Sequence, residues 1–267
     1  GAEEKETVLV KLCIEGLTFA YSSRTVLEQI NLEVNSAITV VIGPNAVGKT
    51  TLLKCICSML KPRGRILLDG RDIGTFTGKE AARIVGYLPQ EIYGGTALTV
   101  LEAVLLGKLH SLRWRVSDDD LDIALEVLEE LGIANLALRS LRELSGGQRQ
   151  LVSIAQVLVQ RPGILLMDEP TSNLDLQHQL EILTLIKRMT RERGLITIIA
   201  MHDLNLAARY ADNIVVLHQG RVYASGRPAS VLTAEVIRAV YGVEARVSVD
   251  DDDVPLITPV RSVRDTK

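Results

Sequence analysis

The sequence predicts an α/β protein with a parallel sheet at its core, an antiparallel β subdomain near the N-terminus and an inserted helical subdomain. Short apolar runs alternate with amphipathic helical segments after residue 160, which is typical of a parallel sheet covered on both faces. Helical periodicity fills residues 99–160, and residues 8–42 show the short apolar pattern of β-strands.

The first elements are strand-like runs at 8–14, 27–34 and 37–43. Apolar residues alternate with polar ones in the second run, so we expect this stretch to form a small antiparallel sheet. The period then becomes helical after Thr50, and the helix ends before Pro62. A strand therefore passes into a helix through a loop that contains glycine.

The remaining elements complete the pattern. Strands at 65–70 and 84–90 flank a short helix near 80–83, and helices follow from Thr99 to Gln160. Beyond them we expect strands at 164–169 and 196–201, helices at 176–193 and 204–211, and a hairpin at 213–226 that turns at Gln219 and Gly220.

We assign residues 7–245 to one domain, with the helical subdomain inserted at about 92–160, and residues 246–267 to a C-terminal hairpin or tail. Two acidic runs have structural explanations. Ser117 and the three aspartates after it fit the start of a helix. The run Asp250–Asp253 fits the polar tip of the C-terminal hairpin.

The composition excludes several classes. The chain has 267 residues, of which 47% are hydrophobic, and a formal net charge of −3, so it can fill a core but offers no positive field for nucleic acid. No apolar run approaches the roughly 20 residues that span a bilayer. Three cysteines indicate neither a disulfide framework nor a zinc site. We expect a protein of the cytosol, without a nucleic-acid partner.

A phosphate-binding pattern stands between a strand and a helix. The string VVIGPNAVGKTTLL contains G-x-x-x-x-G-K-[ST]. Its glycines allow backbone N–H groups to surround phosphate oxygens, Lys49 can reach the outer phosphates, and the Thr50 hydroxyl can bind magnesium. The residues that we expect to bind nucleotide are Gly43, Pro44, Asn45, Ala46, Val47, Gly48, Lys49, Thr50 and Thr51. This predicts a P-loop NTPase core, which GTPases, kinases and motor ATPases share.

A second motif is more specific. The string LSGGQ occupies Leu144–Gln148 and is followed by the apolar strand ILLM, which ends in Asp168 and Glu169. Together with the phosphate loop, these strings resemble the ATP-binding subunit of an ABC transporter, and the resemblance extends from Leu12 to about Gly242. The sequence departs from the family pattern at Ala46 and Val47, where the family commonly has Gly and Ser. We expect nucleotide binding to survive this difference.

The resemblance implies roles for single residues. Tyr21 would stack on adenine, Glu169 would act as the general base, and His202 would contact the γ-phosphate. The implied catalytic set is Lys49, Gln90, Glu169 and His202, and the implied Mg²⁺ ligands are Thr50, Gln90 and Asp168. We expect the other histidines, His110, His178 and His218, to be structural.

The signature implies a dimer. In the family, two subunits pair head to tail, and the signature of one covers ATP held by the other. The residues that would bind ATP in this way, across the dimer, are Leu144, Ser145, Gly146, Gly147, Gln148 and Asp175. By itself, a Ser-Gly-Gly string would more often be a helix cap and a turn.

The resemblance also implies partners. The subunit would dock on separate membrane permease chains at the cytoplasmic face, and a substrate-binding protein would be an indirect partner. The strings HDLNLAARYADNIVVL and VYGVEARV resemble importers of iron–siderophores, haem and cobalamin. A soluble ABC-type ATPase without a permease is an alternative. A structural protein without nucleotide is a third class, but it leaves Lys49, Ser145, Glu169 and His202 unexplained.

Overall fold

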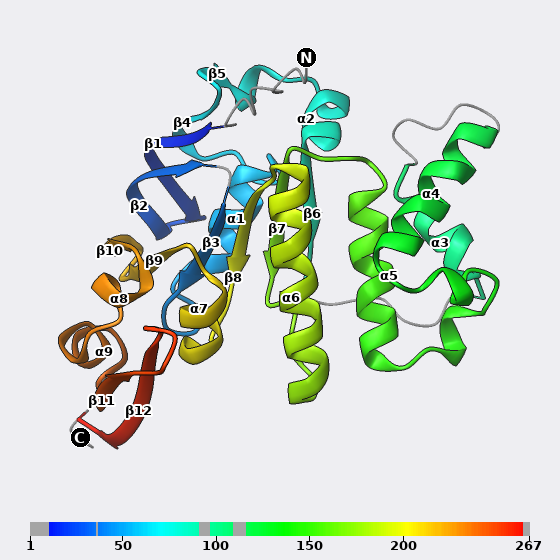
Figure 1. Cartoon of the computed structure of the whole chain (residues 1–267). Helices are drawn as coiled ribbons and strands as arrows, with labels where there is room; N and C mark the ends of the chain where they lie inside the picture. The colour runs from blue at the N-terminus through cyan, green and yellow to red at the C-terminus, as the bar shows by residue number, and fades with distance from the viewer. Residues whose placement is uncertain (1–10, 36, 91–96, 109–115, 264–267) are drawn as a thin grey trace, which may run out of the picture.

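The computed structural model describes residues 11–35, 37–90, 97–108 and 116–263. Its strands form a six-stranded sheet, a four-stranded sheet and a two-stranded sheet, with helices packed around the largest (Figure 1). The predicted α/β class, with its β and helical subdomains, is confirmed. Of the histidines expected to be structural, His110 lies outside the described residues.

The six-stranded sheet has the order β10-β9-β3-β8-β7-β6. Its strands are β3 (Ile38–Ile42), β6 (Val85–Leu88), β7 (Ile164–Asp168), β8 (Ile196–Ala200), β9 (Asn213–His218) and β10 (Arg221–Gly226). Neighbours run parallel except β10, which pairs antiparallel with β9. The turn between them, at Gln219 and Gly220, has positive φ at both residues, and the predicted hairpin is confirmed.

Helices cover both faces of this sheet. Helix α1 (Lys49–Ile56) packs on one face, and α6 (Leu176–Arg193) and α7 (Leu204–Tyr210) pack on the other. Successive residues of each strand therefore contribute to two different cores, because side chains alternate across a strand. In β3, for example, Val41 packs in the core of Leu52 from α1, and Val40 packs in the core on the opposite face.

The placement of β3 corrects one expectation. The sequence pattern put residues 37–43 in the first antiparallel sheet, and this is wrong, because β3 lies between β9 and β8 in the parallel sheet. All five of its residues are buried. A strand covered on both faces reads as a continuous apolar run, which is typical of a parallel sheet.

The four-stranded sheet has the order β2-β1-β4-β5 and is antiparallel. Its strands are β1 (Lys11–Tyr21), β2 (Arg24–Asn35), β4 (Arg63–Leu68) and β5 (Arg71–Asp72), and β5 leads through a short 3-10 turn (Ile73–Thr75) into α2 (Gly78–Ile84). The buried residues of β1 and β2 form one core with α1. The antiparallel subdomain therefore holds the start of α1 against the parallel sheet.

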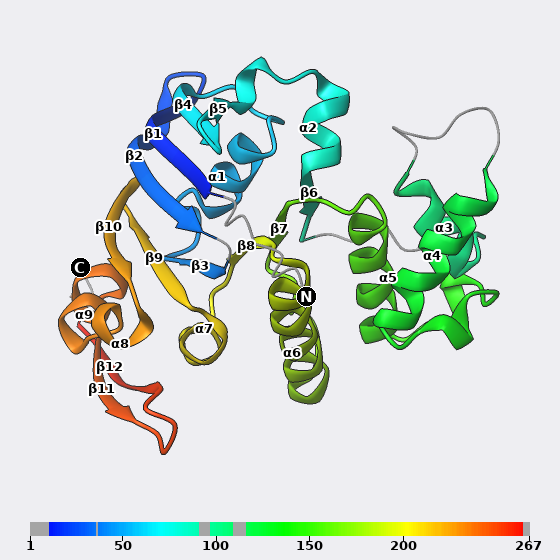
Figure 2. The same cartoon turned by 45° about the horizontal axis from the view of Figure 1, so that its top comes forward.

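The helical subdomain consists of α3 (Val100–Leu106), α4 (Asp118–Glu130) and α5 (Gly146–Leu158), with 3-10 turns at Ala134–Leu136 and Leu141–Glu143. Both views show these helices gathered to one side, beyond α6 (Figure 2). Helix α4 begins at the cap predicted for it, because the Ser117 hydroxyl accepts the Asp120 N–H and the Asp120 carboxylate accepts the Ser117 N–H. The first residues assigned to the subdomain, 92–96, lie outside the described residues.

The chain ends with α8 (Pro228–Val231), α9 (Ala234–Tyr241) and a hairpin of β11 (Val243–Val249) and β12 (Pro255–Ser262). The acidic run Asp250–Asp253 forms the tip of this hairpin, as predicted. The hairpin begins at Val243, and its Ala245 and Ile257 are buried in the core that α6 and α7 share. Within the described part of the chain, no helix is both long and apolar enough to cross a membrane.

Candidate nucleotide-binding site

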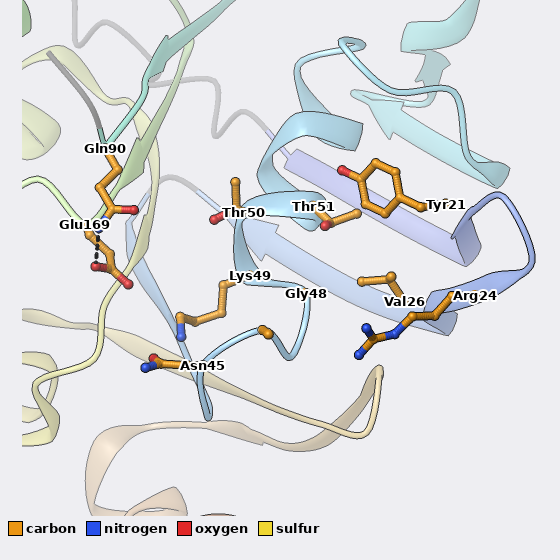
Figure 3. Close-up of a pocket in the computed structure, with 11 residues that line it drawn as sticks. Tyr21, Arg24, Val26, Asn45, Gly48, Lys49, Thr50, Thr51, Gln90 and Glu169 are labelled. Carbon is orange, nitrogen blue, oxygen red and sulfur yellow. Dashed lines mark hydrogen bonds between the residues drawn. The ribbon is translucent and has the colours of Figure 1, made fainter. Parts of the chain in front are cut away.

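The parallel sheet brings the sequence motifs to one edge. The phosphate loop follows β3, Glu169 follows β7, His202 follows β8, and Gln90 follows β6. These four strands run parallel, so their carboxyl ends lie together, which is where α/β sheets bind ligands. A pocket of about 570 Å³ opens there, lined by Tyr21, Arg24, Val26, Asn45, Ala46, Gly48, Lys49, Thr50, Thr51, Gln90 and Glu169 (Figure 3).

Two positions of the phosphate loop require glycine. Gly43 has φ 150° and Gly48 has φ 113°. A Cβ atom at Gly43 would lie 2.4 Å from the carbonyl oxygen of Leu217, and one at Gly48 would lie 2.8 Å from a methyl group of Leu27. The backbone of the loop is therefore packed too closely for any side chain at these positions, which keeps its N–H groups near the surface of the pocket.

Helix α1 starts at Lys49 without a side-chain cap. Its N-cap is Gly48, whereas the Ser145 hydroxyl caps α5 and the Asp175 carboxylate caps α6. Backbone N–H groups of the first turn of a helix have no partner inside the helix, and together with the helix dipole they favour an anion. The start of α1 is therefore suited to phosphate.

Lys49 is buried, and its ammonium group lies inside the loop. The Nζ atom donates to the carbonyl oxygen of Gly43 at 2.9 Å and of Pro44 at 3.4 Å. Burial lowers the pKa of Lys49, while the nearby carboxylates of Glu169 and Asp168 oppose this shift. A partly desolvated cation at the edge of a phosphate loop attracts a polyphosphate strongly.

Asp168 ends β7, and only 3% of the residue is exposed. Burial raises the pKa of its carboxyl group, and a hydrogen bond from the Thr50 hydroxyl opposes this shift. The Tyr87 hydroxyl also donates to Asp168. A carboxylate and a hydroxyl beside a phosphate loop are oxygen donors of the kind that Mg²⁺ prefers, with further ligands from water and phosphate. Among the described residues, no cluster of three or more His, Cys, Asp or Glu could hold a metal by itself.

Glu169 joins residues from three strand ends. Its backbone has a positive φ of 49° and its N–H donates to the carbonyl oxygen of Ala200 at 3.0 Å. Its Oε2 atom accepts a hydrogen bond from Nε2 of Gln90 at 2.9 Å (Figure 3). The Nδ1 atom of His202 lies 3.6 Å from the same oxygen. The structure thus brings three of the predicted catalytic residues together beside Lys49.

Tyr21 stands at the opposite wall of the pocket. It is 47% exposed, and its ring packs edge-on against Phe19 with 4.9 Å between the centroids. The sequence motifs did not indicate Arg24 and Val26, which line the same wall. The one signal for them is the turn at Ser22 and Ser23, because it pairs Arg24 with Tyr21 across the β1–β2 hairpin.

The signature residues do not line this pocket. Ser145 is exposed and caps α5, and its N–H donates to Gln148 Oε1 at 3.0 Å while its hydroxyl accepts the Gln148 N–H at 3.2 Å. Asp175 caps α6 and is also exposed. Leu144 and Gly147 are buried, and Gly146 is exposed. Within one chain, the exposed members of this set, Ser145, Gly146 and Asp175, therefore lie on a second surface, apart from the phosphate loop.

Comparison with known proteins identifies the family. A profile described as "ABC transporter" matches residues 27–172. The chain is 45% identical over 254 residues to an uncharacterized ABC transporter ATP-binding protein of Methanocaldococcus jannaschii, covering 94% of this chain and 99% of the relative. It is 39% identical over 255 residues to the ferric enterobactin transport ATP-binding protein of Escherichia coli, covering 92% and 93%.

A solved structure agrees in fold. The ADP conformation of an ATP-binding cassette of an ABC transporter superposes with a TM-score of 0.81 at 26% identity, covering 88% of this chain and 99% of that one. The phosphate loop, the strand end with Asp168 and Glu169, and the signature all lie within residues 27–172, which the family profile matches. The chain belongs to the ABC transporter family and is one of its ATP-binding, ATP-hydrolysing domains.

Proposed function

We propose that the chain energises import through separate membrane permease subunits, as an ATP-hydrolysing subunit that dimerises when it binds ATP. The observation that carries this proposal is the contact of Glu169 with Gln90 and His202 beside the phosphate loop. The Glu169 carboxylate can take a proton from water, and it lies where the strand ends meet the nucleotide pocket.

ATP is held by groups that the pocket already presents. Tyr21 stacks on the adenine, the N–H groups at the start of α1 bind phosphate oxygens, and Lys49 exchanges its contact with Gly43 for the outer phosphates. Thr50, Asp168 and Gln90 are the residues that would hold Mg²⁺, which neutralises charge on the phosphates during transfer. Thr50 and Asp168 fit this role because they are already joined by a hydrogen bond.

Hydrolysis requires a water molecule that attacks the γ-phosphate. Glu169 orients this water and accepts its proton, and a general base of this kind contributes typically ~10² to 10⁴ in rate. Gln90 fixes the carboxylate by its hydrogen bond, and His202 reaches the γ-phosphate from the neighbouring strand end. All three residues lie at loops that follow strands, so movement of the subdomains can change their spacing.

The second surface completes the ATP site in a dimer. We infer that Ser145 and the N–H groups of the first turn of α5 that its capping box leaves unpaired bind an anion outside the pocket of their own chain. In a head-to-tail homodimer this site, with Asp175, covers ATP on the partner's phosphate loop. Closure of the dimer moves the permeases, and hydrolysis then separates the subunits again.

The relatives support the proposed partners and cargo. The permeases dock at the groove between Gln90 and the helical subdomain, which places the subunit at the cytoplasmic face of the membrane. The ferric enterobactin relative supports an iron–siderophore as cargo, within the group of iron–siderophores, haem and cobalamin. A substrate-binding protein would deliver the cargo to the permeases without contacting this chain.

Reconstitution tests this proposal. The tagged chain is purified in detergent together with any membrane protein that copurifies with it, and the complex is placed in vesicles that contain ATP. Uptake of a radioactive iron–siderophore with the wild type, and none with Lys49→Ala, is the expected result. If no membrane protein copurifies with the chain and its ATPase activity proceeds alone, the subunit is a soluble ATPase and the transport proposal is wrong.

A further inference from the structure

The side chain of His178 lies between the two loops that the proposed dimer presents to the partner's ATP. The signature loop, defined here as Leu144–Gln148, extends into the first turn of α5. The D-loop, defined here as Ser172–Asp175, ends at the cap of α6. These loops come from different subdomains and are distant in sequence. His178, in the first turn of α6, contacts both of them.

The contact with the signature loop is close. A Cβ atom built on Gly147 would lie 2.5 Å from Cδ2 of the His178 ring and 3.1 Å from Cγ. Gly147 therefore leaves room for the imidazole, which packs against the backbone of the first turn of α5. The neighbouring Gly146 faces the Leu174 side chain of the D-loop in the same way, at a longer 3.8 Å.

The contact with the D-loop is a charged hydrogen bond. The Nδ1 atom of His178 lies 2.7 Å from Oδ1 of Asp175, and the same oxygen accepts the backbone N–H of His178 at 3.0 Å. The carboxylate of Asp175 raises the pKa of His178, with a smaller contribution from Glu181. The Nδ1 edge of the ring therefore holds the side chain of Asp175, while the opposite edge, at Cδ2, packs against Gly147.

The space next to the ring is otherwise incompletely filled. A pocket of about 240 Å³ separates α5 from α6 at this point, lined by Leu131, Gly147, Leu151, His178, Glu181, Ile182 and Leu185. Because these helices leave a gap beside the signature, the imidazole is the group that spans it. A side chain that touches both walls of a gap can set their separation.

We propose that His178 is a positioning residue, which fixes the D-loop relative to the signature loop so that both reach the partner's ATP together. This inference rests on the proposed ATP-bound dimer. His178 lies outside the nucleotide pocket of its own chain, so its loss should weaken dimer closure and lower kcat while leaving the ATP affinity of the monomer unchanged.

Dimer assembly in a hydrolysis-deficient parent tests this role. In Glu169→Gln, the fraction of dimer is measured by light scattering against MgATP concentration. Adding His178→Ala should raise the ATP concentration for half-assembly by at least about fivefold, the lower end of typical coupling between sites. Adding His178→Asn should stay within about twofold of the parent, because the amide can donate to Asp175 in place of Nδ1.

A third variant separates positioning from packing. His178→Phe fills the space against Gly147 but cannot bind Asp175, so it should assemble as poorly as His178→Ala, and it replaces that variant if the alanine chain does not fold. His218→Ala is the matched control, since this histidine packs on Tyr223 away from both loops. ATP affinity of each monomer, measured with a fluorescent analogue at low protein concentration, should equal that of the parent.

The outcomes are distinguishable. Assembly of the alanine and phenylalanine variants at the parent's ATP concentration would overturn the role of His178, as would an asparagine variant that fails as badly as they do. A parent that stays monomeric at saturating MgATP would overturn the proposed dimer, and the inference with it.

Discussion

The side-chain amide of Gln90 donates a hydrogen bond to the carboxylate of Glu169 across the ends of two neighbouring strands, with 2.9 Å between Nε2 and Oε2. The two residues are 79 positions apart in sequence. A hydrogen bond to a carboxylate fixes its orientation. The base that would activate water is therefore held by a residue that follows β6, the neighbouring strand.

Replacing Gln90 with alanine should lower kcat for ATP by about tenfold or more, because the variant loses the hydrogen bond that orients the base. Steady-state ATPase kinetics measure this. Gln177→Ala is the matched control, since Gln177 also donates to a glutamate, Glu181, but on the exposed face of α6. Equal kcat values for Gln90→Ala and the wild type would contradict the role of Gln90.

Replacing Lys49 with alanine should weaken ATP binding by about tenfold or more, which corresponds to the loss of a charged hydrogen bond. Calorimetry with ATP measures the affinity. The melting temperature should not fall, since Lys49 is a buried cation whose pKa is lowered by desolvation, and its removal relieves that cost. Lys187→Ala on α6 serves as the control. An unchanged affinity would exclude Lys49 from the phosphate site.

Replacing Ser145 with arginine should prevent dimer assembly while the monomer keeps its affinity for ATP, because Ser145 lies outside the pocket of its own chain. Gel filtration with MgATP in the Glu169→Gln background measures assembly, and a fluorescent ATP analogue measures binding to the monomer. Loss of ATP affinity in the monomer would place the signature in the site of its own chain and contradict the head-to-tail arrangement.

Asp120 should stabilise the helical subdomain in a pH-dependent manner. A hydrogen bond from Lys108, and then those from Ser117, lower the pKa of Asp120 to about 2 from 3.8. A lowered pKa in the folded state means that its stabilisation is complete above pH 3.8 and is lost as the pH falls through about 2. The free energy of unfolding of Asp120→Asn should therefore fall below that of the wild type at neutral pH and converge with it near pH 2.

Urea unfolding across this pH range measures the effect, with Asp119→Asn on the exposed side of the same turn as the control. A difference between wild type and Asp120→Asn that stays constant from neutral pH to pH 2 would show that the charge of Asp120 does not contribute.

Local signals predicted much of the site. The phosphate loop is contiguous, so its residues could be named from the string alone, and Asp168 and Glu169 could be placed because an apolar strand carries them to the edge of the sheet. The position of His202 at this edge could be predicted in the same way, because it also follows an apolar strand. Each of these predictions depends on neighbours in sequence, which a single pattern can capture.

Contacts between distant segments could not be predicted. The hydrogen bond of Gln90 with Glu169 depends on the order of β6 and β7 in the sheet, and Arg24 reaches the pocket only because the β1–β2 hairpin pairs it with Tyr21. His178 carries no motif, and its contacts with Gly147 and Asp175 depend on how the starts of α5 and α6 meet in the fold. The strand β3 was misassigned because a short apolar run does not say which sheet it joins.

In the proposed mechanism, Glu169 is the base for ATP hydrolysis, and it acts in a dimer that closes when ATP binds. Glu169→Gln removes the carboxylate charge while keeping a side chain of similar size. ATPase rate and oligomeric state are measured on the same sample with MgATP. We expect the variant to bind ATP, to hydrolyse it at least about 100-fold more slowly than the wild type, and to accumulate as a dimer. Wild-type turnover, or a variant that binds ATP and remains monomeric, would contradict it.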